Sequence, residues 1–241
     1  MSSPKKSALV TELDSLECRV LLVGDAQCGK SALIQRFVSD KFLEVYAPTS
    51  FDKYSTSHEW SGQMVNFLVW DTSGASAYDS VRPLAYPEAR VVLLCFSIGE
   101  PESLDHVVTK WYPEIRHHCT TAPIILCGCQ SDLRNDIETI SRLAKIRRIP
   151  VTSEQALQVS RKIEAGNYVE TSSRTSVKSV RDAFEVAALA SHGRLNARGG
   201  GGLGSGVVSS HAVRPPSKTN NKARLDLKYE LKDRAKVCSL M

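Results

Sequence analysis

The eight residues 24–31, with the sequence GDAQCGKS, constrain this chain more than any other stretch. They follow the apolar run 18–23 (CRVLLV) and match the pattern G-x-x-x-x-G-K-[ST]. In this pattern glycines let backbone N–H groups turn toward phosphate oxygens, the lysine adds a positive charge, and the serine hydroxyl is placed for Mg²⁺. A helix that begins here points its positive end at the anion. The stretch therefore predicts a site for a nucleoside di- or triphosphate.

Apolar and amphipathic segments alternate through the chain as far as about residue 192. Strands are predicted at 18–23, 51–60, 63–71, 90–97, 123–129 and 167–170, and helices at 29–39, 101–119, 152–163 and 177–190. This alternation indicates an α/β fold with a six-stranded, mostly parallel sheet flanked by helices. Ligands of such sheets bind at the carboxyl ends of the strands, where the phosphate-binding stretch lies.

The composition changes abruptly near residue 193. Residues 199–206 (GGGGLGSG) cannot contribute to a core, so we expect a globular domain at 18–192 between tails at 1–17 and 193–237. The net charge of +5 is too small to indicate nucleic-acid binding, and no signal peptide or transmembrane segment is predicted. Several of the seven cysteines fall in apolar runs, which favours reduced, buried thiols in an intracellular protein.

A second phosphate-side element is predicted at residues 71–74 (DTSG), which end the second strand of the predicted hairpin. The carboxylate of Asp71 can hold Mg²⁺ through water, and the N–H of Gly74 can contact a terminal phosphate. Thr49 lies in the loop before the hairpin, where its hydroxyl can complete a magnesium shell with Ser31; its alternative role is that of a turn residue after Pro48. We therefore expect magnesium ligands at Ser31, Thr49 and, through water, Asp71.

Five segments together resemble Rho-type small GTPases: GDAQCGKS (24–31), YAPTSFDKY (46–54), WDTSG (70–74), DSVRPLAYPEA (79–89) and the terminal CSLM (238–241). Residues 133–150 fall where this family carries its insert helix. Gln27, Cys28 and the absence of a glutamine after Gly74 resemble the Rnd subgroup. The resemblance implies a P-loop small GTPase fold with a Rho-type insert helix, and GTP and Mg²⁺ as cofactors.

The resemblance also implies which residues contact the nucleotide. Phe42 would stack against guanine, and Tyr46 would close over the phosphates. Asp132 would accept two hydrogen bonds from the base, whereas Gln130 replaces a lysine whose stem covers the base, which predicts weaker or less selective guanine binding. The full implied set is Gly24, Ala26, Gln27, Cys28, Gly29, Lys30, Ser31, Ala32, Phe42, Tyr46, Thr49, Gly74, Gln130, Asp132, Ser172 and Ser173.

The positions that support hydrolysis depart from the family pattern, so no intact catalytic residue is expected. Ala75 stands where a glutamine would orient the attacking water, and the methyl group of Ala26 would crowd both that water and an incoming arginine finger. Ser73 replaces an alanine, which is a smaller change. Glutamine and finger together are worth up to ~10⁵ in rate, which predicts a protein that stays bound to GTP. Two alternatives stay open: a slow GTPase switch assisted by Ser73 or a substrate oxygen, and a nucleotide-free scaffold motivated by Gln130.

The terminal residues 238–241 (CSLM) form a C-a-a-X box, whose last residue favours a farnesyl group on Cys238. One prenyl chain anchors a protein only marginally, so the basic residues of 222–236 are expected to add attraction to anionic lipid, unless this tail is merely solvated. Prenylation, methylation and attachment to the cytoplasmic face of the plasma membrane or endomembranes follow from the resemblance. A cytosolic fraction is also expected.

The resemblance places an effector surface on Ser50, Phe51, Asp52, Lys53 and Tyr54. It implies effector and regulatory proteins of Rho signalling as partners, effects on actin organisation and cell shape, and a monomeric protein.

Several cysteines and histidines invite a metal or redox interpretation. Residues 117–119 (HHC), taken with Cys127 and Cys129, fit no structural zinc spacing, so a packing role is preferred. Cys28 lies in the phosphate-binding stretch, where a redox role is conceivable and packing is again the preferred interpretation.

Overall fold

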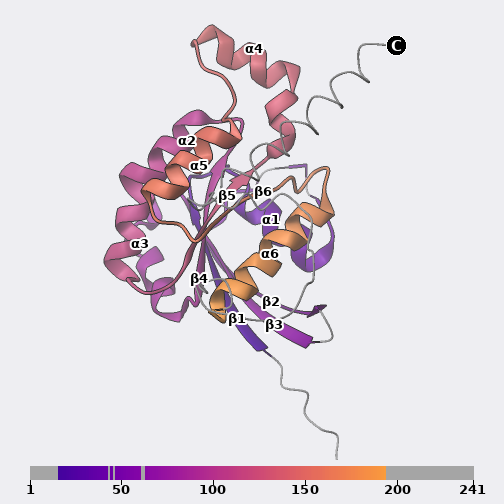
Figure 1. Ribbon diagram of the computed structural model, residues 1–241, viewed down its shortest axis with the longest axis vertical. Coiled ribbons are helices and arrows are strands. Elements are labelled where there is room, and N and C mark those ends of the chain that lie inside the picture. The colour runs from indigo at the N-terminus through magenta and orange to yellow at the C-terminus, as the bar shows by residue number, and fades with distance from the viewer. Residues whose placement is uncertain (1–15, 43, 46, 61–62, 194–241) are drawn as a thin grey trace, which may run out of the picture.

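A computed structural model describes residues 16–42, 44–45, 47–60 and 63–193. Six strands form one sheet: β1 (Leu16–Gly24), β2 (Phe51–Trp60), β3 (Gln63–Thr72), β4 (Val91–Ser97), β5 (Ile124–Cys129) and β6 (Asn167–Glu170). Their order is β2-β3-β1-β4-β5-β6, and only the β2–β3 pair is antiparallel (Figure 1). The predicted mostly parallel α/β fold is confirmed.

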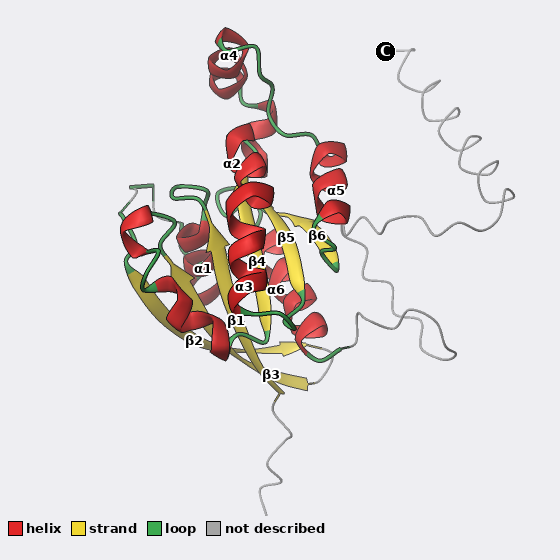
Figure 2. Cartoon of the chain, turned by 90° about the vertical axis from the view of Figure 1, so that its left-hand side faces the viewer, coloured by secondary structure: helices red, strands yellow, loops and turns green. Residues whose placement is uncertain are grey.

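The described residues contain six α-helices, of which the first five lie between strands and the sixth follows β6: α1 (Lys30–Ser39), α2 (Pro101–His106), α3 (Tyr112–His118), α4 (Ile137–Lys145), α5 (Ser153–Lys162) and α6 (Val177–Ser191). Short 3₁₀ segments lie at η1 (Ser76–Tyr78), η2 (Arg82–Glu88) and η4 (Ser131–Asn135). In Figure 2 the helix α4 stands clear of the sheet, within the predicted insert.

The core lies on both faces of the sheet because β4 and β5 are buried along their whole length. Alternate residues of β1 point to opposite faces: Val20 and Leu22 pack with α1 and α6, whereas Leu21 and Val23 pack with α2, α3 and α5. This arrangement leaves the carboxyl ends of the parallel strands free to carry the loops of a site.

Two predicted boundaries need correction. The strand β1 begins at Leu16, two residues before the predicted start, because Leu16 and Glu17 pair with Val65 and Asn66 of β3. The single helix predicted at 101–119 is divided by a π-helical segment, η3 (Val107–Trp111). There the Tyr112 N–H donates to the Val107 carbonyl five residues earlier, and the following Pro113 has no N–H to restore the usual ladder.

The helix α5 begins directly after Thr152, the residue predicted to cap it. Thr152 accepts a hydrogen bond from Gln155 N, and the Gln155 side chain accepts one from Thr152 N, which forms a capping box at the start of α5. Asp136 caps α4 by accepting from Thr139 N at 2.8 Å. Among the helices of the described residues, none is long and apolar enough to cross a membrane.

Candidate functional site

The phosphate-binding loop, residues 24–31, connects β1 to α1. Gly24 has φ +149°, and a Cβ atom there would lie 2.1 Å from the Cys95 carbonyl oxygen, so only glycine fits. The side chain of Lys30 is buried, and its Nζ donates to the Gly24 and Asp25 carbonyls at 2.8 and 2.7 Å. The ammonium group is therefore held against the loop backbone, where it can meet a phosphate.

The predicted magnesium ligands are three oxygen-bearing side chains, those of Ser31, Thr49 and Asp71. Ser31 Oγ and Thr49 Oγ1 are hydrogen-bonded to each other at 2.6 Å. Asp71 is buried at the end of β3, and its Oδ1 atom has no hydrogen-bond partner within the described residues. Burial raises the pKa of Asp71 to about 6. A cation would satisfy this orphaned carboxylate oxygen, and hydroxyl and carboxylate oxygens suit Mg²⁺, so the residues fit the ion.

Gly74 brings the second phosphate-side element into direct contact with the loop. A Cβ atom at Gly74 would lie 2.3 Å from Ala26 N and 2.4 Å from the Gly24 carbonyl oxygen. Thr72 Oγ1 donates to the Leu22 carbonyl at 2.6 Å, which holds β3 against β1 just before this point. The loop and the end of β3 thus form one continuous surface, on which Ala26 and the residue after Gly74 are exposed.

The base-side loops after β5 and β6 are joined by hydrogen bonds. Asp132 Oδ1 accepts from Ser172 Oγ at 2.5 Å, and Ser172 Oγ accepts from Thr175 N at 3.1 Å. The Ser131 N–H donates to the Thr171 carbonyl at 3.0 Å. The carboxylate that would recognise guanine is therefore oriented by the predicted partner loop.

Gln130 links three parts of the site. Its backbone is left-handed, with φ 57°, and its Oε1 accepts from Ser97 Oγ at 2.5 Å. Its Nε2 donates to the Gln27 carbonyl at 3.3 Å. A Cβ atom at Gly29 would lie 3.5 Å from the Gln130 Cγ, so the short stem lies against the phosphate-binding loop. The Gln130 side chain therefore forms hydrogen bonds to Ser97 and Gln27, but it carries no charge.

The remaining predicted residues differ in burial, and two of them lie outside the described residues. Phe42 and Ala32 are half-buried, and Ser173 is buried beside Ser172. Arg36 of α1 orients the Ser173 loop by donating from Nε to the Ser173 carbonyl at 2.9 Å. Tyr46 and Cys238 lie outside the described residues.

The predicted effector residues lie at and just before the start of the edge strand β2. Lys53 Nζ lies 4.2 Å from the centre of the Trp70 ring, and the Phe51 ring centre lies 5.1 Å from that of Trp70. Tyr54 instead accepts a hydrogen bond from Gln35 Nε2 of α1 at 3.1 Å. Ser50 and Asp52 are exposed.

The sequence did not predict the residues of the neighbouring helical segments that hydrogen-bond to the phosphate-binding loop and to the DTSG element. Asp25 accepts from Trp111 Nε1 at 2.6 Å, and its other carboxylate oxygen lies 2.7 Å from His106 Nδ1. Arg82, with a side chain only 1% exposed, donates to the Ser73 carbonyl at 2.8 Å and to both carboxylate oxygens of Glu114. These partners are far apart along the chain, so no local sequence pattern predicts that they form hydrogen bonds.

The cysteines and histidines considered as metal or redox candidates do not all lie together in the described residues. Cys28 is buried below the loop with Sγ 3.7 Å from the Cys95 carbonyl oxygen, and burial raises the pKa of its thiol to about 12, which favours packing over redox chemistry. Among the described histidines, cysteines and carboxylates, only Cys95, Cys127 and Cys129 gather closely enough to share a metal ion. The histidines at 117–118 are not part of that group.

Comparisons with known proteins agree with this geometry. The sequence model of the Ras family matches residues 19–192. The Rho-related GTP-binding protein RhoE of Homo sapiens is 39% identical over 227 residues, covering 94% of this chain and 92% of RhoE. The GTP-binding proteins RHO1 of Candida albicans and rho5 of Schizosaccharomyces pombe are each 44% identical over 176 residues, covering 73% of this chain and 88% of each relative.

Proposed function

Because this chain belongs to the Rho family of small GTP-binding proteins, in its Rnd-like group, we propose that it binds GTP with Mg²⁺ and retains it without efficient hydrolysis. The protein would act as a binding module whose GTP form engages effectors.

The residues suited to hold the nucleotide surround the carboxyl ends of the strands. Lys30 and the backbone N–H groups of the phosphate-binding loop would hold the phosphates, and Asp132 with Ser172 would hold the base. Ser31, Thr49 and Asp71 would hold Mg²⁺, which neutralises phosphate charge when bound.

The observation that carries the proposal is the pair of alanines at the hydrolysis positions. Ala26 lies against Gly74, and Ala75 follows Gly74 directly, so both lie beside the place expected for the terminal phosphate. A methyl group cannot hydrogen-bond an attacking water. The loss of a water-orienting amide removes the group that, with an arginine finger, supplies up to ~10⁵ in rate.

The proposal includes a membrane-attached location and effector binding. A prenyl group on Cys238, aided by the basic residues of 222–236, would hold the protein at the cytoplasmic face of the plasma membrane or endomembranes. The exposed start of β2 would present residues 50–54 to effectors that act on actin organisation and cell shape.

Nucleotide content tests the proposal directly. Freshly purified protein is denatured by heat, and the released nucleotide is quantified by chromatography. GTP in near-stoichiometric amount is the expected result. GDP would instead indicate a cycling switch, and the absence of nucleotide would indicate a scaffold.

Hydrolysis by the loaded protein is then measured in a single turnover, alone and with a Rho-directed activating protein. We expect no measurable acceleration for the natural sequence. The double variant Ala26→Gly/Ala75→Gln should hydrolyse GTP at least about tenfold faster, and the conservative variant Ser73→Ala should not. Activator-stimulated hydrolysis by the natural sequence would contradict the proposal.

A further inference from the structure

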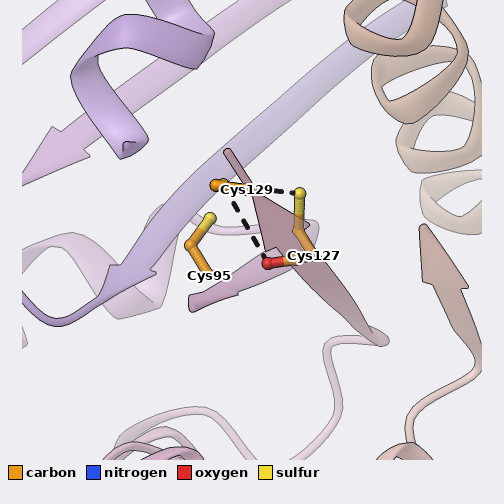
Figure 3. Close-up of side chains that lie close together, drawn as sticks. All are labelled: Cys95, Cys127 and Cys129. Carbon is orange, nitrogen blue, oxygen red and sulfur yellow. Dashed lines mark hydrogen bonds between the residues drawn. The ribbon is translucent and has the colours of Figure 1, made fainter. Parts of the chain in front are cut away.

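Three buried cysteines gather on one face of the sheet, below the phosphate-binding loop. Cys95 lies on β4, and Cys127 and Cys129 lie on the neighbouring strand β5, where Cys127 is the register partner of Cys95. Their Sγ atoms all lie within 4.8 Å of one another, and those of Cys127 and Cys129 are 3.8 Å apart (Figure 3). Figure 3 shows the three side chains close together, with dashed lines from Cys129 to the sulfur and to the backbone carbonyl oxygen of Cys127.

The spacing of these sulfurs suits a single metal ion. A zinc-sized ion lies about 2.3 Å from each thiolate sulfur, so three sulfurs around it in a plane are about 4 Å apart. The thiols of this cluster therefore need to move by less than about 1 Å to share one ion. Cys95 and Cys127 lie on two paired strands inside the sheet, so the backbone at these two positions is fixed before an ion binds.

The apolar surroundings of the three sulfur atoms indicate which class of metal ion they would bind. The cluster belongs to the apolar core between the sheet and the helices α1 and α6, and each of its residues is at most 2% exposed. Thr171 Oγ1, 3.8 Å from Cys127 Sγ, is a neutral oxygen near the group. Sulfur donors in an apolar site favour soft ions and disfavour Mg²⁺ or Ca²⁺.

Packing alone gives a weaker account of the cluster. A core position between strands needs apolar volume, which Val or Ala supplies without a sulfur atom. The three sulfur atoms instead lie within 4.8 Å of one another, and the thiol of Cys18 in the same core is not part of the group.

We propose that Cys95, Cys127 and Cys129 form a three-thiolate site for a soft, thiophilic metal ion, of the class of Cu(I), Zn(II) or Cd(II). Each thiol releases its proton as its sulfur–metal bond forms, and no electron is transferred. Binding of the ion would tie the carboxyl ends of β4 and β5 together beneath the loop that carries Gln130. The proposal is independent of whether the protein retains GTP.

Cd(II) is a suitable probe because cadmium–thiolate bonds absorb in the ultraviolet. Reduced, metal-free, full-length protein is titrated with Cd(II) under nitrogen. We expect the absorbance to saturate at one equivalent, and the unfolding temperature to rise by several degrees because the ion binds the folded chain. Cys127→Ala should lose the signal or bind at least about tenfold more weakly.

Matched controls separate this site from other thiols. Cys18→Ala removes a thiol of the same apolar core, and Cys238→Ser removes the thiol of the C-a-a-X box; both should bind Cd(II) as the natural sequence does. A titration unchanged by Cys127→Ala would overturn the proposal, as would a reduced protein that shows no cadmium–thiolate band.

Should Cys127→Ala fail to fold, X-ray absorption on the natural sequence loaded with one equivalent of Cd(II) still decides the question. Three sulfur neighbours around the ion are expected. One sulfur, or a shell made mainly of oxygen, would contradict the site. A disulfide among these three cysteines in protein purified without reductant, with no metal uptake after reduction, would also contradict it.

Discussion

Gly74 is the residue at which two parts of the site meet most closely. Its Cα hydrogen faces the backbone of the phosphate-binding loop, and an added methyl group would lie 2.3 Å from Ala26 N. The atoms in the way are backbone atoms, which cannot move aside as a flexible side chain can. The same closeness places Ala26 against Gly74, which Ala75 follows directly in the chain.

We predict that Gly74→Ala lowers GTP affinity by at least about tenfold and destabilises the fold by about 1–3 kcal/mol, because the loop must shift to admit the methyl group. Affinity is measured with a fluorescent GTP analogue, and stability by urea unfolding.

Gly166→Ala is the matched control for this substitution. A Cβ atom at Gly166 would approach no atom closer than 3.8 Å, so the variant should bind GTP as the natural sequence does. Equal affinities for the Gly74→Ala variant and the natural sequence would show that the two elements do not meet as described.

At the scale of elements, the end of β6 is joined to η4 and α5 by one carboxylate. Glu170 accepts two hydrogen bonds from the Arg134 guanidinium, at 2.6 and 2.8 Å, and one each from Tyr168 and Ser153. Burial raises the pKa of Glu170, but these hydrogen bonds outweigh it and leave the pKa below its usual value. Because Arg134 follows Asp132 by two residues, this junction also positions the base-side loop.

We predict that Glu170→Gln destabilises the protein by about 1–3 kcal/mol at pH 7, because Arg134 loses its charged partner. A carboxyl with a lowered pKa contributes stability above its unfolded value of about 4.5, and this contribution is lost as the pH falls through the lower folded value. The difference between the variant and the natural sequence should therefore shrink below pH 4.5 in urea unfolding experiments.

Asp182→Asn serves as the control for this junction. Asp182 pairs with Lys178 one turn away on α6, and the Lys178 side chain is 66% exposed. Exposed pairs of this kind contribute at most about 0.5 kcal/mol. A pH-independent cost for Glu170→Gln would argue against an ionised, hydrogen-bonded carboxylate.

At the scale of the whole molecule, the strand order gathers segments that are distant in sequence at one end of the sheet. The carboxyl ends of β1, β3, β5 and β6 carry the phosphate-binding loop, the DTSG element and the two base-side loops. The C-a-a-X box lies outside the described residues, and Cys238 follows the last residue of α6 by 47 positions. The proposed membrane attachment therefore involves a part of the chain separate from the nucleotide site.

We predict that Cys238→Ser moves the protein from the membrane fraction to the soluble fraction in cells, while GTP binding by the purified variant is unchanged. Fractionation of a fluorescently tagged chain measures the first effect. Cys119→Ser, which alters a half-buried thiol of the domain, should leave the membrane fraction as it is. If Cys238→Ser stayed on membranes, the lipid-anchor assignment would be wrong.

Features encoded by neighbouring residues could be predicted from the sequence. The strand–loop–helix of residues 24–31, the hairpin strands, the cap at Thr152 and the six-stranded sheet follow from local periodicity and side-chain chemistry. The division of the helix at 101–119 was missed, although Pro113 carries a local signal for it.

Local sequence patterns specify the fold class and the residue types available to the nucleotide site, because strand and helix patterns repeat over a few residues. Tertiary packing brings together side chains that no local pattern pairs: Asp25 with Trp111, Arg82 with Glu114, and Cys95 with Cys127 and Cys129. These contacts join residues from different strands and helices. They depend on strand order and register, which are set by packing of the whole core and not by any one segment.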